Sequence, residues 1–334
     1  MRCLVTGGAG FIGSHLSERL LRSGHEVTAI DDLSTGSVEN ILSLRSHPDY
    51  EFHGDSIFNR RLMAELVDLA DIVFHLAAAV GVKRIVDFPV QTIETNVGGT
   101  EIVMELAAKK QRRLLIASTS EVYGKSNKLP FSEVDDLVLG STYNHRWAYA
   151  CSKAIDEFLA LAYFREYRLP VTILRLFNTV GPRQTGRYGM VVPTFVRQAL
   201  LQQPLTVFGD GTQSRCFAHV SDVIDGFLAV AADATTVGEI FNLGNTEEIS
   251  MTELAERVIA MTGSSSQIRY VAYSEAYGPG FEDMSRRIPD IAKAQQWLGF
   301  KPKYSLDAVL RDVIAFTRHQ VGRERAVFVT APTE

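Results

Sequence analysis

A glycine-rich turn opens the sequence at Arg2-Cys3-Leu4-Val5-Thr6-Gly7-Gly8-Ala9-Gly10-Phe11-Ile12-Gly13, where a short apolar run meets a cluster of glycines. An amphipathic helical pattern follows over residues 14–21. This order predicts the strand, turn and helix of a dinucleotide-binding unit. Gly7 would permit the tight turn, Gly10 would let a pyrophosphate approach the backbone, and Gly13 would let the helix pack closely on the strand.

A second apolar run over residues 25–30 ends in Asp31. An acidic residue about twenty positions after the glycines accepts hydrogen bonds from adenosine ribose hydroxyls in such units. The phosphates of the ligand would then lie at the helix N-terminus, where free N–H groups favour negative charge. Asp31 therefore favours NAD over NADP as the cofactor, because its charge would repel the 2′-phosphate of NADP.

Strand-like and helix-like segments alternate along the first half of the chain. Apolar runs of strand length occur at residues 50–55, 71–78, 113–118 and 171–175. Helical patterns lie at about 90–109 and 145–167. This alternation with short loops predicts an α/β fold, with a Rossmann-type doubly wound parallel sheet.

The character of the sequence changes after Asn178, where elements become shorter. We therefore expect a NAD-binding Rossmann domain over residues 1–177, completed by segments that return from the second half. A smaller α/β substrate-binding lobe would occupy mainly residues 178–320. Residues 321–334 show no clear period, and we assign them no structure.

The composition is that of an ordinary globular enzyme, with 46% hydrophobic and 22% charged residues and a formal net charge of −5. No basic block stands out, so we expect no nucleic-acid or membrane partner. No apolar run approaches membrane-spanning length and the first strand begins almost immediately, which together favour a cytoplasmic protein. Cys3, Cys151 and Cys216 are odd in number and lack metal-ligand spacing, so we expect reduced thiols and no metal.

Two further strand ends are candidates for cofactor contacts. Asp55 ends the third run and could accept a hydrogen bond from the adenine amino group, although a plain turn aspartate has the same pattern. Leu76, Ala77 and Ala78 end the fourth run. Small side chains there would leave room for the cofactor or allow close helix packing.

The chemical argument rests on Tyr149 and Lys153, which share one face of a helix because they are four residues apart. A tyrosine has a pKa of about 10, so a base near pH 7 requires a fall of roughly three units. An adjacent lysine and a positive nicotinamide ring can supply that fall. The run 118–121 (Ser-Thr-Ser-Glu) ends the fifth strand at the sheet edge where ligands bind in such folds.

These motifs resemble those of extended short-chain dehydrogenases/reductases that modify nucleotide sugars. The resemblance covers nearly the whole sequence, through the glycine motif, Tyr149 with Lys153, and Phe177-Asn178-Thr179-Val180-Gly181-Pro182-Arg183. Within that superfamily, residues 119–124, 146–149 and 283–291 resemble the UDP-glucuronate decarboxylases.

The resemblance implies a role for each matching residue. Thr119 would hydrogen-bond the sugar 4-oxygen, Tyr149 would remove its proton, and Lys153 would hold Tyr149 and the nicotinamide ribose. Glu121 and Ser120 would act near C5, and Arg287 would bind the diphosphate or a carboxylate. The full set of implied substrate-binding residues is Lys83, Arg84, Asn178, Arg183, Phe208, Arg215 and Arg287. The expected cofactor-binding residues are Gly7, Gly10, Phe11, Ile12, Gly13, Asp31, Asp55, Leu76, Ala77, Ala78, Tyr149 and Lys153.

Every reaction that the resemblance implies begins with removal of hydride from C4 of a UDP-sugar by NAD. Decarboxylation of UDP-glucuronate to UDP-xylose or its 4-keto product is our first prediction. The segment Gly81-Val82-Lys83-Arg84 is closer to that of hexuronate and hexose 4-epimerases. Epimerisation of UDP-glucuronate or UDP-glucose at C4 is therefore the alternative, and NDP-sugar 4,6-dehydration is a further one. Intact Thr119, Tyr149 and Lys153 disfavour a protein that binds NAD without turnover.

The two long helical patterns also bear on assembly, because apolar residues occur on more than one of their faces. We expect a homodimer formed by helices across a two-fold axis, as is common in the family. The apolar residues that suggest it include Ile102, Val103, Leu106, Phe158, Leu161 and Phe164.

Overall fold

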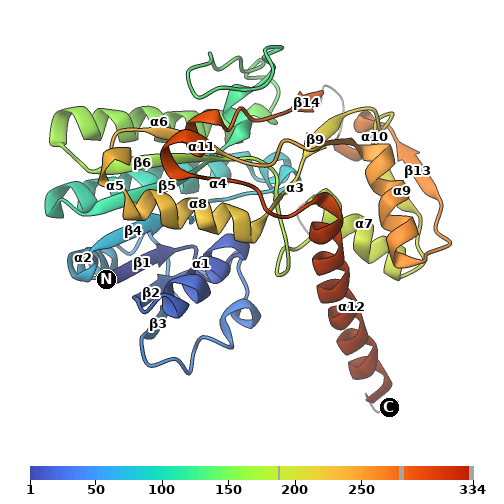
Figure 1. Ribbon diagram of the computed structural model, residues 1–334, viewed down its shortest axis with the longest axis horizontal. Helices are drawn as coiled ribbons and strands as arrows, with labels where there is room; N and C mark the ends of the chain where they lie inside the picture. The colour runs from blue at the N-terminus through green and yellow to red at the C-terminus, as the bar shows by residue number, and fades with distance from the viewer. Residues whose placement is uncertain (187–188, 278–281, 331–334) are drawn as a thin grey trace.

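A seven-stranded parallel sheet forms the larger part of the molecule (Figure 1). The computed structural model describes residues 1–186, 189–277 and 282–330. In spatial order the strands are β11 (Ile240–Leu243), β6 (Val171–Leu176), β5 (Arg113–Thr119), β4 (Ile72–His75), β1 (Arg2–Thr6), β2 (Glu26–Ile30) and β3 (Tyr50–His53). The strand order reverses between β1 and β4, and ligands bind beside such a reversal in open α/β sheets. The predicted Rossmann-type doubly wound fold is confirmed.

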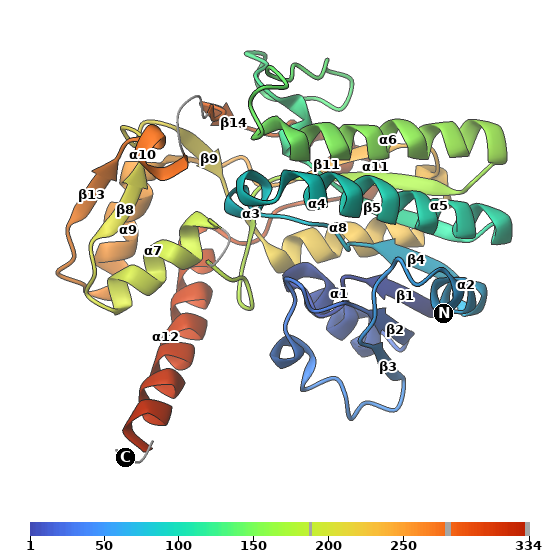
Figure 2. The same cartoon turned by 180° about the vertical axis from the view of Figure 1, so that it is seen from behind.

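Helices cover both faces of this sheet (Figures 1 and 2). One face carries α1 (Phe11–Arg22), α8 (Val220–Ala232) and α11 (Ala292–Leu298). The other carries α2 (Arg60–Leu69), α5 (Gly99–Lys110) and α6 (Trp147–Tyr167). Side chains alternate between the two layers along each strand, as in β1, where Leu4 joins one core and Cys3 and Val5 the other. Because both faces of the sheet are buried, the sequences of these strands are continuous apolar runs.

The second half of the chain supplies elements to both parts of the molecule. Strand β11 and helices α8 and α11 return to the large sheet, whereas the division at residue 177 stays a prediction. A smaller lobe has a core formed mainly by α7 (Val191–Leu200), α9 (Met251–Thr262) and α12 (Leu306–Thr330). Its other elements are β7 (Thr179–Val180), β8 (Leu205–Phe208), β9 (Ser214–Cys216), β10 (Ala218–His219), β12 (Glu248–Ser250), β13 (Ile268–Val271), α10 (Tyr273–Tyr277) and β14 (Arg286–Arg287).

The helix expected over about 90–109 is present, but it is not α-helical throughout. It consists of α4 (Pro89–Ile93), a π-helical segment (Glu94–Gly98) and α5, and α3 (Val82–Asp87) precedes it. Asn96 of the π-helical segment is buried, and its amide accepts from the Ala79 N–H at 2.8 Å and donates to Ser152 Oγ of α6 at 3.1 Å. A π-helical turn places this amide between α6 and the end of β4, which is a common use of such turns near functional sites.

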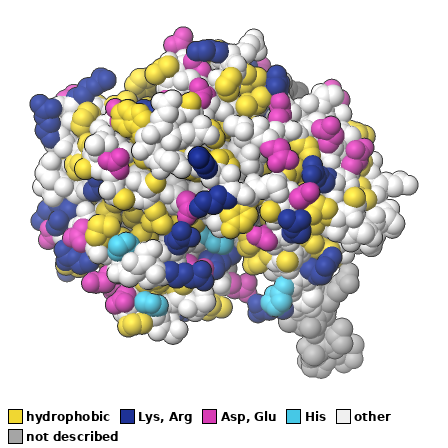
Figure 3. Space-filling view, viewed as in Figure 1, with side chains coloured by type: hydrophobic (Ala, Val, Ile, Leu, Met, Phe, Trp, Pro, Cys, Tyr) yellow, Lys and Arg dark blue, Asp and Glu magenta, His cyan; other side chains and the backbone are white. Residues whose placement is uncertain are grey.

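Helix α12 extends beyond the smaller lobe and continues through residues 321–330, to which the sequence pattern assigned no structure (Figure 1). In the described part of the chain, no helix has the length and apolar character that crossing a membrane requires. Positive and negative side chains are interspersed over the face that Figure 3 presents. The remaining short helical turns are Val38–Ile41, Ser120–Tyr123 and Ala234–Thr236.

Candidate active site

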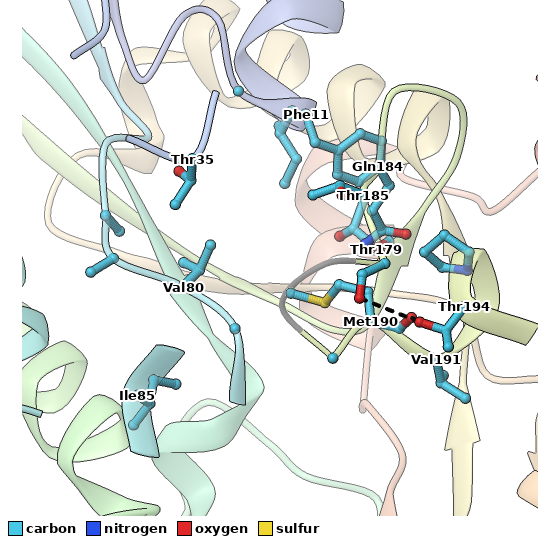
Figure 4. Close-up of a pocket in the computed structure, with 18 of the residues that line it drawn as sticks. Phe11, Thr35, Val80, Ile85, Thr179, Gln184, Thr185, Met190, Val191 and Thr194 are labelled. Carbon is cyan, nitrogen blue, oxygen red and sulfur yellow. Dashed lines mark hydrogen bonds between the residues drawn. The ribbon is translucent and has the colours of Figure 1, made fainter. Parts of the chain in front are cut away.

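A cavity of about 1590 Å³ lies between the large sheet and the smaller lobe, at the carboxyl ends of β1, β2, β4 and β5. Residues from both halves of the chain line it, and Figure 4 shows Thr35, Val80 and Ile85 on one side with Gln184, Thr185 and Thr194 on the other. The hydroxyl of Thr194 donates to the Met190 carbonyl at 2.7 Å, which ties the loop after residue 189 to α7. The cavity is large enough for a dinucleotide and a second ligand.

The glycine turn has the close packing that its sequence predicts. A Cβ at Gly13 would lie 2.1 Å from the Gly7 carbonyl oxygen, and Gly7 has a φ of +70° and lies against the Ala77 backbone. No side chain caps α1 at Gly10. The first N–H groups of α1 therefore face the cavity beside Phe11 and Ile12, as a phosphate site requires.

Asp31 lines the cavity at the end of β2. Its carboxylate accepts from the Ala9 N–H at 3.0 Å and from the Leu33 N–H at 2.8 Å, so it is fixed in orientation with lone pairs left for a ligand. Burial raises the pKa of Asp31 and these two backbone donors oppose the rise. Asp55 also lines the cavity, and its carboxylate accepts from the Asn59 amide at 2.8 Å.

Thr119 and Tyr149 line the cavity, and Lys153 follows Tyr149 by about one turn of α6. Burial raises the pKa of Tyr149 above its ordinary value, Glu121 adds to the rise, and a hydrogen bond from Thr119 opposes it. A phenolate would therefore need a positive partner in the assembled site. Lys153 is 2% exposed, and its Nζ lies 2.8 Å from Oδ2 of Asp156.

Five charged side chains beside Tyr149 form what we call the cavity cluster: Glu121, Arg146, Arg215, Asp283 and Arg287. Arg146 pairs closely with Glu121 and lies 3.6 Å from Asp283, while Arg287 pairs with Glu121 at 3.4 Å. Arg215 pairs with Asp283 at 2.9 Å. The cluster therefore carries three positive and two negative charges.

Electrostatics within the cavity cluster favour an incoming anion. Burial opposes ionisation of Glu121, but Arg146 and Arg287 hold its pKa below the ordinary value. Burial and the positive charge of Arg215 lower the pKa of Arg287 to about 10. A carboxylate or phosphate ligand would stabilise the charged form of this arginine.

Three buried polar atoms around the cluster have no hydrogen-bond partner among the residues that the structure describes. They are the hydroxyl oxygen of Ser120 and the Nε atoms of Arg146 and Arg287. All three residues line the cavity. Because buried donors are almost always satisfied in folded proteins, these atoms point to a polar ligand that is bound in the working state.

The other predicted substrate-binding residues are more dispersed. Asn178 donates to the Cys216 carbonyl at 3.0 Å, and Arg183 pairs with Glu18 of α1 at 2.6 Å. Both of these residues line the cavity, as does Phe208 at the end of β8. Lys83 and Arg84 belong to α3, but their side chains lie outside the described residues.

Sequence reasoning missed three charged residues of this region. Arg146 lies one helical turn before Tyr149, so the i, i+3 spacing was a signal for it. Asp156 is at the same spacing after Lys153. Asp283 comes from a loop far along the sequence, and no local spacing indicates that it joins Arg146 and Arg215.

Comparisons with known proteins agree with this geometry. The family model described as GDP-mannose 4,6 dehydratase matches residues 4–313. A UDP-N-acetyl-alpha-D-glucosaminuronate decarboxylase of Bacillus cytotoxicus is 43% identical over 95% of this chain and 98% of its own length. UDP-glucuronic acid decarboxylase 1 of Arabidopsis thaliana is 37% identical over 97% of this chain and 71% of its own length.

A solved structure of similar shape is the UDP-glucuronic acid 4-epimerase of Bacillus cereus, in complex with UDP-glucuronic acid and NAD. It superimposes with a TM-score of 0.86 at 30% identity, covering 96% of this chain and 100% of the epimerase chain. The resemblance drawn from the sequence motifs is confirmed. The chain belongs to the GDP-mannose 4,6 dehydratase family, within the extended short-chain dehydrogenases/reductases that modify nucleotide sugars.

Proposed function

We propose that this protein is an NAD-dependent decarboxylase of a UDP-linked hexuronate. The observation that carries the proposal is the set of unpartnered donors at Ser120, Arg146 and Arg287 within a cluster of net positive charge. A sugar carboxylate at C6 would supply the missing acceptors, whereas a neutral C6 hydroxyl would leave a buried arginine uncompensated.

The residues of the glycine turn fit NAD. The uncapped first turn of α1 offers N–H groups for the pyrophosphate, and Asp31 has free lone pairs for the ribose hydroxyls. NAD, when bound, supplies the acceptor for hydride from C4 of the sugar. The carboxylate of Asp31 would disfavour the 2′-phosphate of NADP.

Tyr149 takes the proton of the C4 hydroxyl in this proposal, and Thr119 holds the same oxygen by a hydrogen bond. Lys153 contributes the positive charge that a buried phenolate needs. Oxidation at C4 makes the sugar a β-keto acid. The C5–C6 bond then breaks and carbon dioxide leaves. The electrons of that bond move toward the C4 oxygen, and C5 then takes up a proton. Arg287 and Arg146 hold the carboxylate until that bond breaks.

The state of Glu121 argues against dehydration. A 4,6-dehydratase needs a base that removes the C5 proton. Arg146 and Arg287 both stabilise the Glu121 carboxylate, and a carboxylate so stabilised is a weak base. Decarboxylation makes no such demand, because the electrons that reach the ring come from the broken C5–C6 bond.

Epimerisation at C4 is the second candidate. It is supported by the Gly81-Val82-Lys83-Arg84 segment and by the likeness to a solved UDP-glucuronic acid 4-epimerase. The same carboxylate contacts serve either reaction. The outcome depends on whether the C5–C6 bond breaks before hydride returns to C4.

The relatives' names suggest two hexuronates, UDP-glucuronate and UDP-N-acetylglucosaminuronate. The test is to incubate the protein and NAD with each of these and with UDP-glucose, and to identify products by NMR. Carbon dioxide and a pentose product from either hexuronate would support decarboxylation. A product that retains C6 with inverted C4 would assign epimerisation instead, and turnover of UDP-glucose alone would contradict a carboxylate substrate.

We further propose a homodimer formed through α4 and α6. Exposed apolar side chains gather there: Phe88 is 58% exposed, Val90 67% and Phe158 70%. This corrects the sequence-based list, because Ile102 and Val103 are buried in the protomer. A monomeric mass at micromolar concentration in solution would contradict the dimer.

The three cysteines form no disulfide, which supports a reducing compartment such as the cytoplasm.

A further inference from the structure

A buried hydrogen-bond chain runs behind the active site and ends at Lys153. Oδ2 of Asp156 accepts from the Lys153 ammonium at 2.8 Å and from the Thr100 hydroxyl at 3.3 Å. Thr100 Oγ1 lies 3.0 Å from Nε2 of His75, and Nδ1 of His75 lies 2.8 Å from Thr6 Oγ1. All five of these side chains are at most 2% exposed. The chain therefore links α6, α5, β4 and β1 in the interior of the domain.

One set of proton positions is consistent with every contact in the chain, while Oδ1 of Asp156 has no partner among the described residues. Thr100 donates to Asp156, so it accepts from His75 Nε2–H, and Nδ1 of that ring then accepts from the Thr6 hydroxyl. Burial lowers the pKa of His75 to about 3, in keeping with a neutral ring. Thr6 Oγ1 accepts in turn from the N–H groups of residues 76 and 77, each at 3.2 Å. These two residues line the cofactor side of the cavity.

The pairing of Lys153 with Asp156 compensates for the cost of burying a charged ammonium. An ammonium as buried as that of Lys153 would lose its proton readily without a counter-charge. A neutral lysine would not stabilise a Tyr149 phenolate. The position i+3 places Asp156 one helical turn from Lys153, where its carboxylate also reaches Thr100 of α5.

We propose that Asp156 is a positioning residue that keeps Lys153 positively charged and holds its ammonium in place beside Tyr149. The consequence for catalysis rests on the function proposed above, whereas the charge pairing itself does not. The Thr100–His75–Thr6 chain fixes the orientation of the Asp156 carboxylate. It also connects that carboxylate to the backbone that faces the cofactor.

Three other ionisable side chains face this pair. His75 of β4 stays neutral, as noted above. Glu157 of α6 is held in a bidentate pair with Arg175. Burial, Glu121 and Asp156 itself raise the pKa of Tyr149 above its ordinary value in the free protein, whereas Thr119 and Arg146 oppose the rise. Between pH 6 and 9.5, changes in the stability of a variant relative to wild type therefore report on Lys153.

The first experiment measures thermal stability of Asp156→Asn against pH in the free protein. Without its counter-charge, folded Lys153 releases its proton more readily than the unfolded chain does. The unfolded state then binds more protons, so stability rises with pH relative to wild type. We expect a melting temperature roughly 5 to 10 °C below wild type at pH 6 and a deficit of no more than about half of that at pH 9.5.

Lys153→Met is the mirror-image variant and also serves if Asp156→Asn fails to fold. It leaves the carboxylate uncompensated, so the folded state retains a proton on Asp156 that the unfolded chain has lost. Its deficit should therefore grow as pH rises from 4 to 8. The double variant Asp156→Asn with Lys153→Met should show a deficit independent of pH. Deficits independent of pH in both single variants would overturn the proposal.

The pH dependence of turnover gives a second readout that a purely structural role would not move. In Asp156→Asn the alkaline limb of the kcat profile should shift to lower pH by at least about one unit, because lysine loses its charge earlier. Asp156→Glu should restore part of that shift. An unmoved limb in an active Asp156→Asn enzyme would contradict the assignment. Absence of any turnover by wild type would count against the proposed function alone. The stability experiment would still test the charge pairing of Asp156 with Lys153.

Discussion

Two arginine–glutamate sites in this protein differ in how completely their hydrogen-bond donors are used. In the first, which we call the closed pair, Arg175 of β6 donates from Nε to Glu157 Oε1 at 3.0 Å and from Nη2 to Oε2 at 2.7 Å. Its Nη1 donates to the Glu133 carbonyl, and its guanidinium lies 4.7 Å from the Tyr123 ring centroid. The second is the cavity cluster, where Arg146 and Arg287 share Glu121.

The cavity cluster has the same chemistry but is incomplete. Arg146 and Arg287 each keep a buried Nε without a partner among the described residues, and the cluster has one more positive than negative charge. The closed pair satisfies its own charges within the protein. The difference teaches that burial and ion pairing alone do not mark a binding site. In the cavity cluster, the unused arginine donors that face the cavity are the feature that points to a ligand.

The largest expected effect concerns the chemistry beside the cavity cluster. Tyr149→Phe should lower kcat for the hexuronate by on the order of 10²–10⁴, the usual worth of a positioned base, and leave NAD binding unchanged. Tyr167→Phe is the matched control, because Tyr167 lies on the same helix and is 60% exposed. Steady-state kinetics and calorimetric NAD titration measure the two quantities. Near-normal turnover of Tyr149→Phe would remove this residue from the mechanism.

The next effect tests the closed pair. Arg175→Met should destabilise the protein by about 3 to 5 kcal/mol, because Glu157 would be left buried without its partner. Arg287→Met should cost far less stability, since its charge is already poorly compensated. Denaturant unfolding at pH 7 compares the two variants. Equal losses of stability would erase the distinction between the two sites.

A smaller effect concerns the selectivity of the cavity cluster. Arg287→Met should weaken UDP-glucuronate binding roughly 10- to 100-fold, the worth of a charge-assisted hydrogen bond, and should hardly affect UDP-glucose. Arg286→Met is the control, because Arg286 is exposed and pairs with Glu248 instead. Calorimetric titration of both ligands measures the ratio. Parallel weakening of both would assign Arg287 to the diphosphate.

The smallest effect lies at the far end of the cavity. Asp31→Ala should narrow the preference for NAD over NADP by about tenfold, because the carboxylate that repels a 2′-phosphate is removed. Dissociation constants for both cofactors at fixed ionic strength provide the measurement. An unmutated protein that binds both cofactors equally would defeat this prediction at once.

Local patterns in the sequence were enough to predict the fold and the principal catalytic candidates. The glycine turn, Asp31, and the Tyr149–Lys153 spacing each depend on residues close together in the chain, so periodicity and spacing reveal them. The cavity cluster could be predicted only in part. Arg287 came from a motif resemblance, whereas the pairing of Arg215 with Asp283 joins strand β9 to a distant loop, a contact that no local pattern encodes.

A periodicity argument also could not predict the π-helical geometry at Glu94–Gly98 within this helix. The spacing of apolar residues in this segment predicts one regular α-helix. The π-helical turn is stabilised by the Asn96 amide, whose partners at Ala79 and Ser152 come from other parts of the fold. The same holds for Asp156, whose function depends on Thr100 and His75 rather than on its neighbours in sequence.

The position of β11 at the edge of the large sheet has a consequence during synthesis. Strand β6 is almost wholly buried and apolar, yet its outer partner β11 follows roughly 60 residues later. At ordinary rates of translation the ribosome needs on the order of 3 to 12 seconds to add those residues. Throughout that interval the nascent chain has an unpaired apolar strand edge, which is a site for misassociation or for chaperone capture. Polysomes that carry this message at high density would therefore favour aggregation between neighbouring nascent chains.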